Sequence, residues 1–166
     1  MAEHSVSTTA FIRPSTSEDT AALLSISEAT KMFKPIELIA LREVLDDYHQ
    51  INQAAGHLCF TLESRGQITG FTCFAEAAMT DRTWYLYWIA VNPAAQGQGL
   101  GSQLLQWTET VIQQKYGRQL LIETGSVPHY EPTRRFYLNH RYEQVAVVPD
   151  YYAEGDSMVV FRKRFV

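Results

Sequence analysis

Residues 83–102 read TWYLYWIAVNPAAQGQGLGS, and this stretch decides the fold. Its first part, up to Val91, is the most apolar run of the chain and lacks the polar alternation of a half-buried strand. Such a run predicts a central strand over Thr83–Val91 that is covered on both faces. The glycine-rich turn that follows opens a predicted helix, which extends from Gly99 to about Tyr116.

A glycine-rich turn between a strand and a helix is suited to binding an anion. The N–H groups of the first helical turn have no partners within the helix, and the helix dipole adds partial positive charge there. Glycine lets a phosphate approach the backbone closely because it has no Cβ, and it tolerates positive φ angles. The turn therefore predicts a phosphate-binding loop over Gln96–Ser102.

Spacing distinguishes three kinds of phosphate loop. A nucleotide P-loop ends in Gly-Lys-Ser/Thr, and no glycine of this chain is followed by lysine. A Rossmann fingerprint, Gly-x-Gly-x-x-Gly, needs a third glycine where Ser102 stands. The spacing that remains is Gln-x-x-Gly-x-Gly, from Gln96 to Gly101. A turn that only caps a helix, without any ligand, is the alternative interpretation.

Composition limits the classes of protein that this chain fits. With 166 residues, 46% of them hydrophobic, we expect a flexible tail over 1–9 and a single domain over 10–166. A net charge of −4 gives no basic field for nucleic acid. No apolar run approaches the roughly 20 residues that span a bilayer, and the N-terminus is unlike a signal peptide. We therefore expect a cytoplasmic protein without nucleic-acid or membrane partners. The histidines and cysteines lack metal-site spacing, so no metal is expected.

The rest of the chain predicts short strands and helices around the loop. Strands are expected at 10–13, 57–63, 67–77, 119–124, 142–148 and 157–164, besides the central one. Further helices are expected after a capping box of Ser15 and Glu18, from Pro35 to about Tyr48, and over 132–139. The resulting order is β-α-α-β-β-β-α-β-α-β-β.

This order and the Gln-x-x-Gly-x-Gly spacing resemble the GNAT N-acetyltransferase superfamily. The likeness covers roughly residues 10 to 165, and Val91-x-Pro93 and Arg135-Phe136-Tyr137 add to it. It implies an α/β (α+β) GNAT fold, in which about four helices surround a mixed, mostly antiparallel sheet of about seven strands. It also implies acetyl-CoA as cosubstrate and a small amine as acceptor.

The resemblance assigns acetyl-CoA to the loop and to the strand before it. Backbone N–H groups of the loop hold the pyrophosphate, from Gln96, Gly97, Gln98, Gly99, Leu100, Gly101 and Ser102. The pantetheine arm pairs with an exposed strand edge at Trp88, Ile89, Ala90 and Val91. Because the loop has no Arg or Lys, Arg134 or Arg135 from the later helix is the expected cationic contact, and arginines that only face solvent are the alternative.

Acetyl transfer to an amine needs a base, a donor to the oxyanion and an acid for the departing thiolate. The resemblance implies Tyr137 as the acid, with a core tyrosine as the alternative. Histone-acetylating relatives carry a base on the strand before the loop, where this chain has Tyr85. Glu123 is therefore the expected replacement, acting through a water or attracting a cationic amine. A carboxylate that only faces solvent is the alternative.

These features together predict direct transfer of an acetyl group from acetyl-CoA to a primary amine of a small or amino-acid-like acceptor. A catalytically silent acyl-CoA sensor or protein-interaction domain is the alternative. The last strands, with Phe161 and Phe165, are candidates for pairing in a homodimer. Candidates for an aromatic acceptor wall are Tyr130, Tyr142, Tyr151, Tyr152, Phe33 and Trp84.

The loop yields a first test. We expect a bulky residue at Gly99 or Gly101 to weaken CoA binding far more than Gln96→Ala or Gln98→Ala, because backbone amides hold the phosphate. Calorimetric titration with CoA measures the difference. Comparable losses in all four variants would show that side chains hold it instead.

Overall fold

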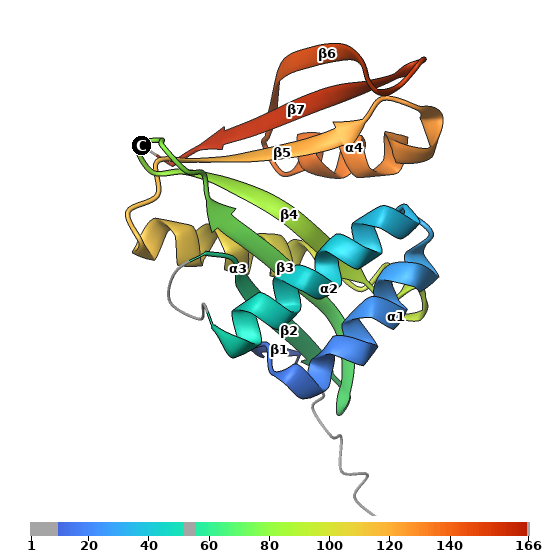
Figure 1. The fold of residues 1–166 in the computed structure, drawn as a ribbon, viewed down its shortest axis with the longest axis vertical. Coiled ribbons are helices and arrows are strands. Elements are labelled where there is room, and N and C mark those ends of the chain that lie inside the picture. The colour runs from blue at the N-terminus through green and yellow to red at the C-terminus, as the bar shows by residue number, and fades with distance from the viewer. Residues whose placement is uncertain (1–9, 52–55, 166) are drawn as a thin grey trace, which may run out of the picture.

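Seven strands form one sheet in the computed structural model, which describes residues 10–51 and 56–165 (Figure 1). The strands are β1 (Phe11–Pro14), β2 (Leu58–Ser64), β3 (Gln67–Glu76), β4 (Thr83–Val91), β5 (Gln119–Gly125), β6 (Glu143–Ala153) and β7 (Asp156–Arg164). They lie in the order β1-β2-β3-β4-β5-β7-β6, and each described pair is antiparallel except β4 with β5. The expected mixed, mostly antiparallel sheet is confirmed. The tail predicted over 1–9 lies outside the described residues.

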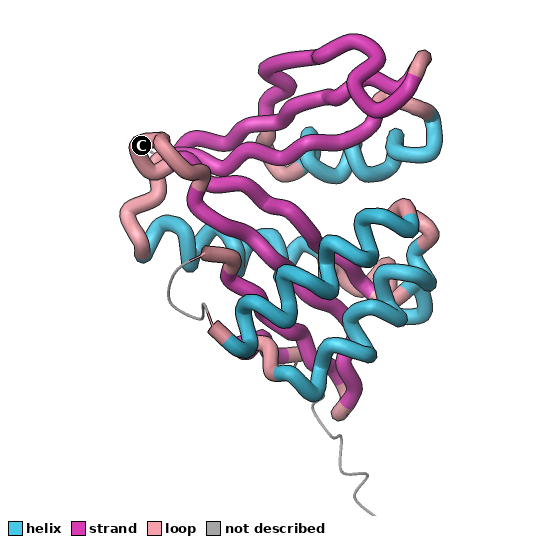
Figure 2. The backbone as a smooth tube through the Cα atoms, in the orientation of Figure 1, coloured by secondary structure: helices cyan, strands magenta, loops and turns pink. Residues whose placement is uncertain are grey.

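The α-helices lie on both faces of this sheet, as Figure 2 shows. Helices α1 (Thr20–Thr30) and α2 (Pro35–Gln50) pack on one face of β2–β4, and α3 (Leu100–Gln114) packs on the other. Helix α4 (Glu131–Asn139) shares the α3 face and lies against β5 and β7. The expected order of strands and helices is confirmed. Among the helices described, none has the length and apolarity that crossing a bilayer requires.

Strand β4 loses its partner β5 halfway along its length. From Thr83 to Leu86 it runs parallel to β5, opposite Gln119–Ile122. Tyr87 is then an extra residue relative to β3, because Leu86 pairs with Phe74 while Trp88 pairs with Cys73. A bulge of this kind bends a strand and increases its twist. Beyond it β4 pairs with β3 alone among the described strands, and Figure 1 shows β4 and β5 diverging.

Three apolar clusters hold the strands in this diverging arrangement. Trp84 and Leu86 of β4 share a cluster with Ile122 of β5, beneath α3 and α4. After the bulge, Ala90 belongs to the cluster under α1 and α2. Val91 belongs to a third cluster at the start of α3. The end of β4 is therefore packed into different helices from the end of β5.

The predicted capping box of Ser15 and Glu18 is wrong by one residue. The Thr16 N–H donates to Asp19 Oδ2 at 2.9 Å, and Ser15 is buried. Asp19 takes this role because Arg13 draws its carboxylate inward with two hydrogen bonds, of 2.7 and 2.9 Å. Burial acts to raise the pKa of Asp19, but these bonds outweigh it and lower the pKa to about 2.

The last hairpin also departs from the prediction. The sequence predicts a strand that ends at Val148, before Pro149, whereas β6 continues to Ala153. Between the pairs Val148–Met158 and Ala153–Asp156, residues 149–152 of β6 lie opposite Ser157 alone. A proline fits here because a bulged residue does not need its N–H for the ladder. Phe161 of β7, a candidate for a dimer contact, is fully buried instead.

Candidate functional site

The divergence of β4 from β5 leaves one edge of β4 without a neighbouring strand. After Leu86 the parallel pairing ends, so alternate N–H and C=O groups on this side have no strand partner among the described residues. Buried backbone groups of this kind need hydrogen-bond partners. An extended ligand that adds itself to the edge supplies them.

The glycine loop begins where this free edge ends. Asn92 caps a short 3-10 turn, Pro93–Ala95, by accepting the Ala94 N–H at 3.0 Å. The side chain of Gln96 then turns back, and its Nε2 donates to Val91 O at 3.1 Å. This bond ties the loop to β4, so Gln96 contributes its side chain to the loop's shape.

The loop fits a pyrophosphate through its backbone. Gly97 and Gly99 have φ angles of 77° and 78°, in the left-handed region, and a Cβ on either would meet nothing within 4 Å. The first hydrogen bond of α3 runs from Gln103 N–H to Gly99 O at 3.1 Å. The N–H groups before Gln103 in the first turn are therefore available to an anion, those of Leu100, Gly101 and Ser102.

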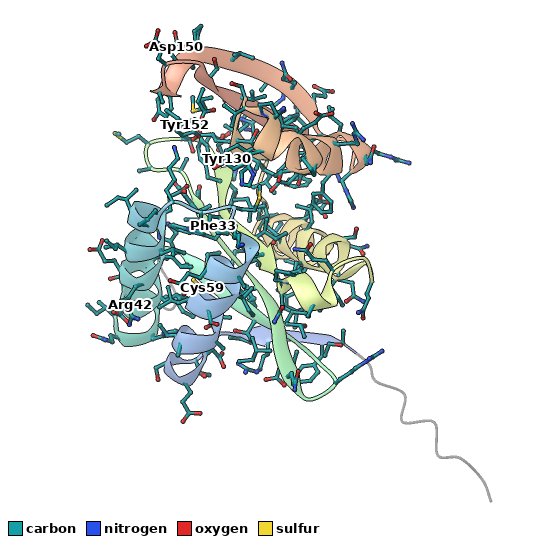
Figure 3. The ribbon with its side chains drawn as sticks, turned by 90° about the vertical axis from the view of Figure 1, so that its right-hand side faces the viewer. Phe33, Arg42, Cys59, Tyr130, Asp150 and Tyr152 are labelled. Atoms are coloured by element: carbon teal, nitrogen blue, oxygen red, sulfur yellow. The ribbon has the colours of Figure 1, made fainter. Side chains whose placement is uncertain are left out.

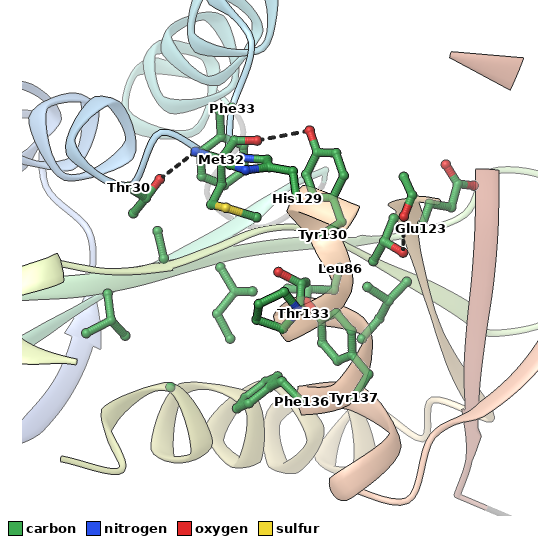
Figure 4. A pocket seen from close by; sticks show the side chains of 18 of the residues that line it. Thr30, Met32, Phe33, Leu86, Glu123, His129, Tyr130, Thr133, Phe136 and Tyr137 are labelled. Carbon is green, nitrogen blue, oxygen red and sulfur yellow. Dashed lines mark hydrogen bonds between the residues drawn. The ribbon is translucent and has the colours of Figure 1, made fainter. Parts of the chain in front are cut away.

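A cavity of about 730 Å³ joins this loop to the surface above β4 and β5. Figure 4 shows its walls, with the α1–α2 connection on one side and Phe136 and Tyr137 near α3 on the other. Of the residues predicted to bind the cosubstrate, nine line the cavity: Ile89, Ala90, Val91, Gln96, Gly97, Gly99, Leu100, Gly101 and Ser102. Trp88 and Gln98 are not among its lining residues, and Trp88 packs under α1 and α2.

Arg135 does not line this cavity either. Its guanidinium is exposed and pairs with Glu131 one helical turn away, at 2.7 Å. It borders a separate shallow depression on the outer side of α4. The neighbouring Arg134 donates to Gly125 O at 2.7 Å and to Val127 O at 3.1 Å. The contact predicted between Arg135 and the cosubstrate stays a prediction.

Tyr137 lines the cavity from α4 and is only 3% exposed. Its ring packs against those of Tyr142 and Phe161, and its hydroxyl has no hydrogen-bond partner among the described residues. Burial raises the pKa of Tyr137 well above its usual range. The phenol therefore stays protonated at neutral pH and can serve only as a proton donor there.

Glu123 lines the same cavity from β5, just beyond the point where β5 separates from β4. The Glu123 residue is exposed, and partial burial of its carboxyl group raises the pKa of Glu123 above its ordinary value. Burial first, and then the charge of Glu123, raise the pKa values of Tyr85 and Tyr87 on the neighbouring strand. The carboxylate thus faces phenol rings across the opening between the two strands.

The far end of the cavity is aromatic and closed by the α1–α2 connection. Tyr130 donates its hydroxyl to Met32 O at 3.2 Å, and His129 Nε2 lies 3.0 Å from Lys31 O. Figure 3 shows Tyr152, Tyr130 and Phe33 in succession between the last hairpin and the start of α2. Of the candidate aromatic wall, these three line the cavity, whereas Trp84 and Tyr142 are buried in the core and Tyr151 lies outside it.

Three carboxylates surround this aromatic end. After burial, the charges of Glu123, Glu37 and Asp156 all act on Tyr152 and raise its pKa to about 12. Asp156 is 8% exposed, and its Oδ1 accepts the Ser126 N–H at 3.0 Å. Glu37 and Asp156 were outside the sequence prediction, because nothing in their local pattern sets them apart from ordinary helix and hairpin carboxylates. Only the fold brings them beside Glu123.

The chain is similar to known proteins in sequence and in fold. The family model for the acetyltransferase (GNAT) family matches residues 24–141. A crystal structure from Desulfovibrio desulfuricans, classed with the GNAT acetyltransferases, is 29% identical with a TM-score of 0.91, over 95% of this chain and 100% of that one. No curated protein matches the chain.

More distant structures share the fold. An acetyltransferase structure from Salmonella typhimurium, crystallised with acetyl-CoA, is 20% identical with a TM-score of 0.76, over 95% of this chain and 94% of that one. An aminoglycoside 6'-N-acetyltransferase complexed with coenzyme A is 14% identical with a TM-score of 0.72, over 94% and 97% of the two chains. These two structures thus hold acetyl-CoA and coenzyme A, respectively.

A substitution at Gly125, which lies close to Tyr130, tests the role of the aromatic end of the cavity. A Cβ on Gly125 would lie 2.6 Å from Tyr130 Cδ2 and 2.9 Å from Asp156 Oδ1, so Gly125→Ala must displace one of them. We expect the KM for the acceptor to rise at least about fivefold, since overpacking costs on the order of 1 kcal/mol or more. The CoA dissociation constant serves as the internal control and should change less than about twofold. An unchanged acceptor KM would contradict a role for Tyr130 in this wall.

Proposed function

Because the chain belongs to the GNAT acetyltransferase family, we propose that it moves the acetyl group of acetyl-CoA directly to a primary amine of a small acceptor. One observation carries the proposal: the glycine loop, the free edge of β4, Tyr137 and Glu123 all line one cavity. Acetyl-CoA supplies the acetyl group as an activated thioester. No cysteine is among the residues that line the described cavity, in keeping with transfer in a single step.

Each of the two ionisable side chains fits one proton transfer. Glu123 accepts a proton from the incoming ammonium, and a raised carboxyl pKa brings it closer to the pKa that a base needs near neutral pH. Tyr137 holds its proton at neutral pH and donates it to the departing thiolate, and the second proton lost by the acetylated nitrogen returns to the phenolate. Backbone N–H groups on the free edge of β4 hold the cosubstrate and polarise the carbonyl.

The acceptor end of the cavity favours a cation. The charges of Glu37, Glu123 and Asp156 act on Tyr152 there, and Lys34 is the one Lys or Arg among the described lining residues. Its Nζ lies 5.2 Å from the centre of the Tyr152 ring, which leaves the carboxylates in excess. Tyrosine faces add attraction for cations. We therefore propose an acceptor that bears a second positive charge besides the reacting amine.

Assembly and location stay proposals. Strand β6 forms an edge of the sheet and every residue of it is exposed, including Val145, Val147 and Tyr151. An exposed edge strand with apolar side chains can pair with a second copy. The homodimer that we propose therefore uses β6. A cytoplasmic location remains our proposal as well.

Acceptor class is tested by release of free CoA with three amines of equal chain length. We expect 1,4-diaminobutane to exceed butylamine in kcat/KM, and 4-aminobutanoate to be poorest, because its carboxylate meets like charges.

Glu37→Gln, which can still accept the Lys34 N–H, should raise the KM for the diamine about fivefold. Glu43→Gln on the exposed side of the same helix is the matched control. A preference for 4-aminobutanoate would contradict the cationic acceptor. CoA binding without turnover of any amine, in a broader screen, would favour the silent sensor.

The role of Tyr137 is tested by Tyr137→Phe. We expect kcat to fall roughly 100-fold or more, with CoA affinity almost unchanged, since only the proton donor is removed. Tyr142→Phe is the control, because that ring is also 3% exposed but its hydroxyl binds Glu109 outside the cavity. Full activity of Tyr137→Phe across the pH range would remove Tyr137 from the mechanism.

A further inference from the structure

A serine–histidine pair joins the phosphate loop to the end of α4. Ser102 Oγ, at the start of α3, lies 2.8 Å from His140 Nε2. The other ring nitrogen, His140 Nδ1, lies 2.7 Å from Phe136 O, and the ring is tilted by 43° against that of Phe136, with centroids 4.2 Å apart. Ser102 lines the cavity, whereas His140 lies behind it.

These two contacts determine which way the serine proton points. A carbonyl oxygen can only accept, so Nδ1 carries a hydrogen and donates it to Phe136 O. In the neutral imidazole Nε2 is then bare and accepts the Ser102 O–H. The hydroxyl proton therefore points away from the anion site. The lone pairs of Ser102 Oγ point toward the loop instead.

Protonation of His140 reverses this bond. A hydrogen on Nε2 donates to Ser102 Oγ, and the hydroxyl proton becomes free to donate toward the cavity. The loop end gains both a donor and a nearby positive charge, at a place where no described Arg or Lys lines the wall. Both the hydroxyl donor and the positive charge stabilise a bound pyrophosphate anion.

We propose that His140 is a positioning residue for CoA, and that binding of the pyrophosphate draws one proton onto the His140–Ser102 pair. The proposal rests on the proposed use of acetyl-CoA. Binding then raises the pKa of the pair, so affinity is highest at acid pH and falls as pH rises through the bound-state pKa.

Charged groups from neighbouring elements lie around the His140–Ser102 pair. Lys163 of β7 donates to His140 O at 3.2 Å and is paired with both carboxylate oxygens of Glu109 on α3, at 2.9 Å. Tyr142 donates to the same carboxylate, and Arg141 beside the ring is exposed. The end of the α4 dipole favours a cation, while the start of α3 opposes it. A phosphate bound at the start of α3 adds negative charge that favours a proton on the pair.

Dephospho-CoA is the sharpest probe. It keeps the pyrophosphate diester but lacks the terminal phosphate monoester, whose own second pKa of about 6 would contribute protons of its own. We expect its dissociation constant to rise about tenfold from about pH 6 to about pH 8, the range in which an imidazole titrates. Calorimetry in buffers of different ionisation enthalpy should show proton uptake at neutral pH. Pantetheine, without phosphates, should show neither effect.

Variants distinguish this linkage between proton uptake and binding from a purely structural role of His140. His140→Gln cannot titrate, so proton uptake and the pH dependence should both disappear, and Ser102→Ala should reduce both. His49→Gln is the matched control, because His49 forms a similar bond to Ser15, at 3.0 Å, outside the cavity. It should leave the proton uptake intact.

The wild-type protein gives a second readout that needs no variant. The pKa of His140, followed by NMR, should rise when dephospho-CoA is added. An unchanged His140 pKa, or affinity independent of pH, would overturn the proposal while leaving the acetyltransferase function standing. Failure of CoA and dephospho-CoA to bind at any pH would overturn both.

Discussion

Separation of two parallel strands is the constraint on which the rest of this structure depends. A parallel pair normally satisfies the backbone of both strands along their whole length. Here the pairing ends at Leu86, and the bulge at Tyr87 turns the remainder of β4 aside. The opening persists because apolar burial holds each side, with Ala90 under α1 and α2 and Ile122 under α3 and α4. Closing it would expose core surface on both sides.

The same separation places the phosphate loop. Strand β4 ends in Val91 and leads directly through the Asn92 cap into the glycines. Because Gln96 binds back to Val91 O, the loop and the free strand edge form one rigid surface. Left-handed φ angles at Gly97 and Gly99 then direct the chain into α3 with its first N–H groups unpaired. Anion binding here depends on the backbone, and side chains such as Ser102 and His140 can only modify it.

Sequence patterns identify the half of the site that local chain geometry builds. The apolar run Thr83–Val91 and the glycine turn are contiguous, so the strand and the loop could be predicted without knowing any long-range contact. The bulge at Tyr87 could not, because it exists only relative to β3. The acceptor end is equally hidden. It assembles Lys34, Asp156 and Tyr130 from three distant segments, and a proline that reads as a strand end proved to belong to a bulge.

Burial also explains how one cavity can serve both proposed proton transfers. Removing water disfavours whichever form of a side chain is charged, so it raises the pKa of a carboxyl and of a phenol alike. For Glu123 that shift moves a weak base toward the pH at which it must act. For Tyr137 it removes any competing phenolate, so the phenol holds its proton throughout the neutral range. Acid and base therefore need no opposite environments: their different ordinary pKa values, displaced in the same direction, already give them different proposed roles.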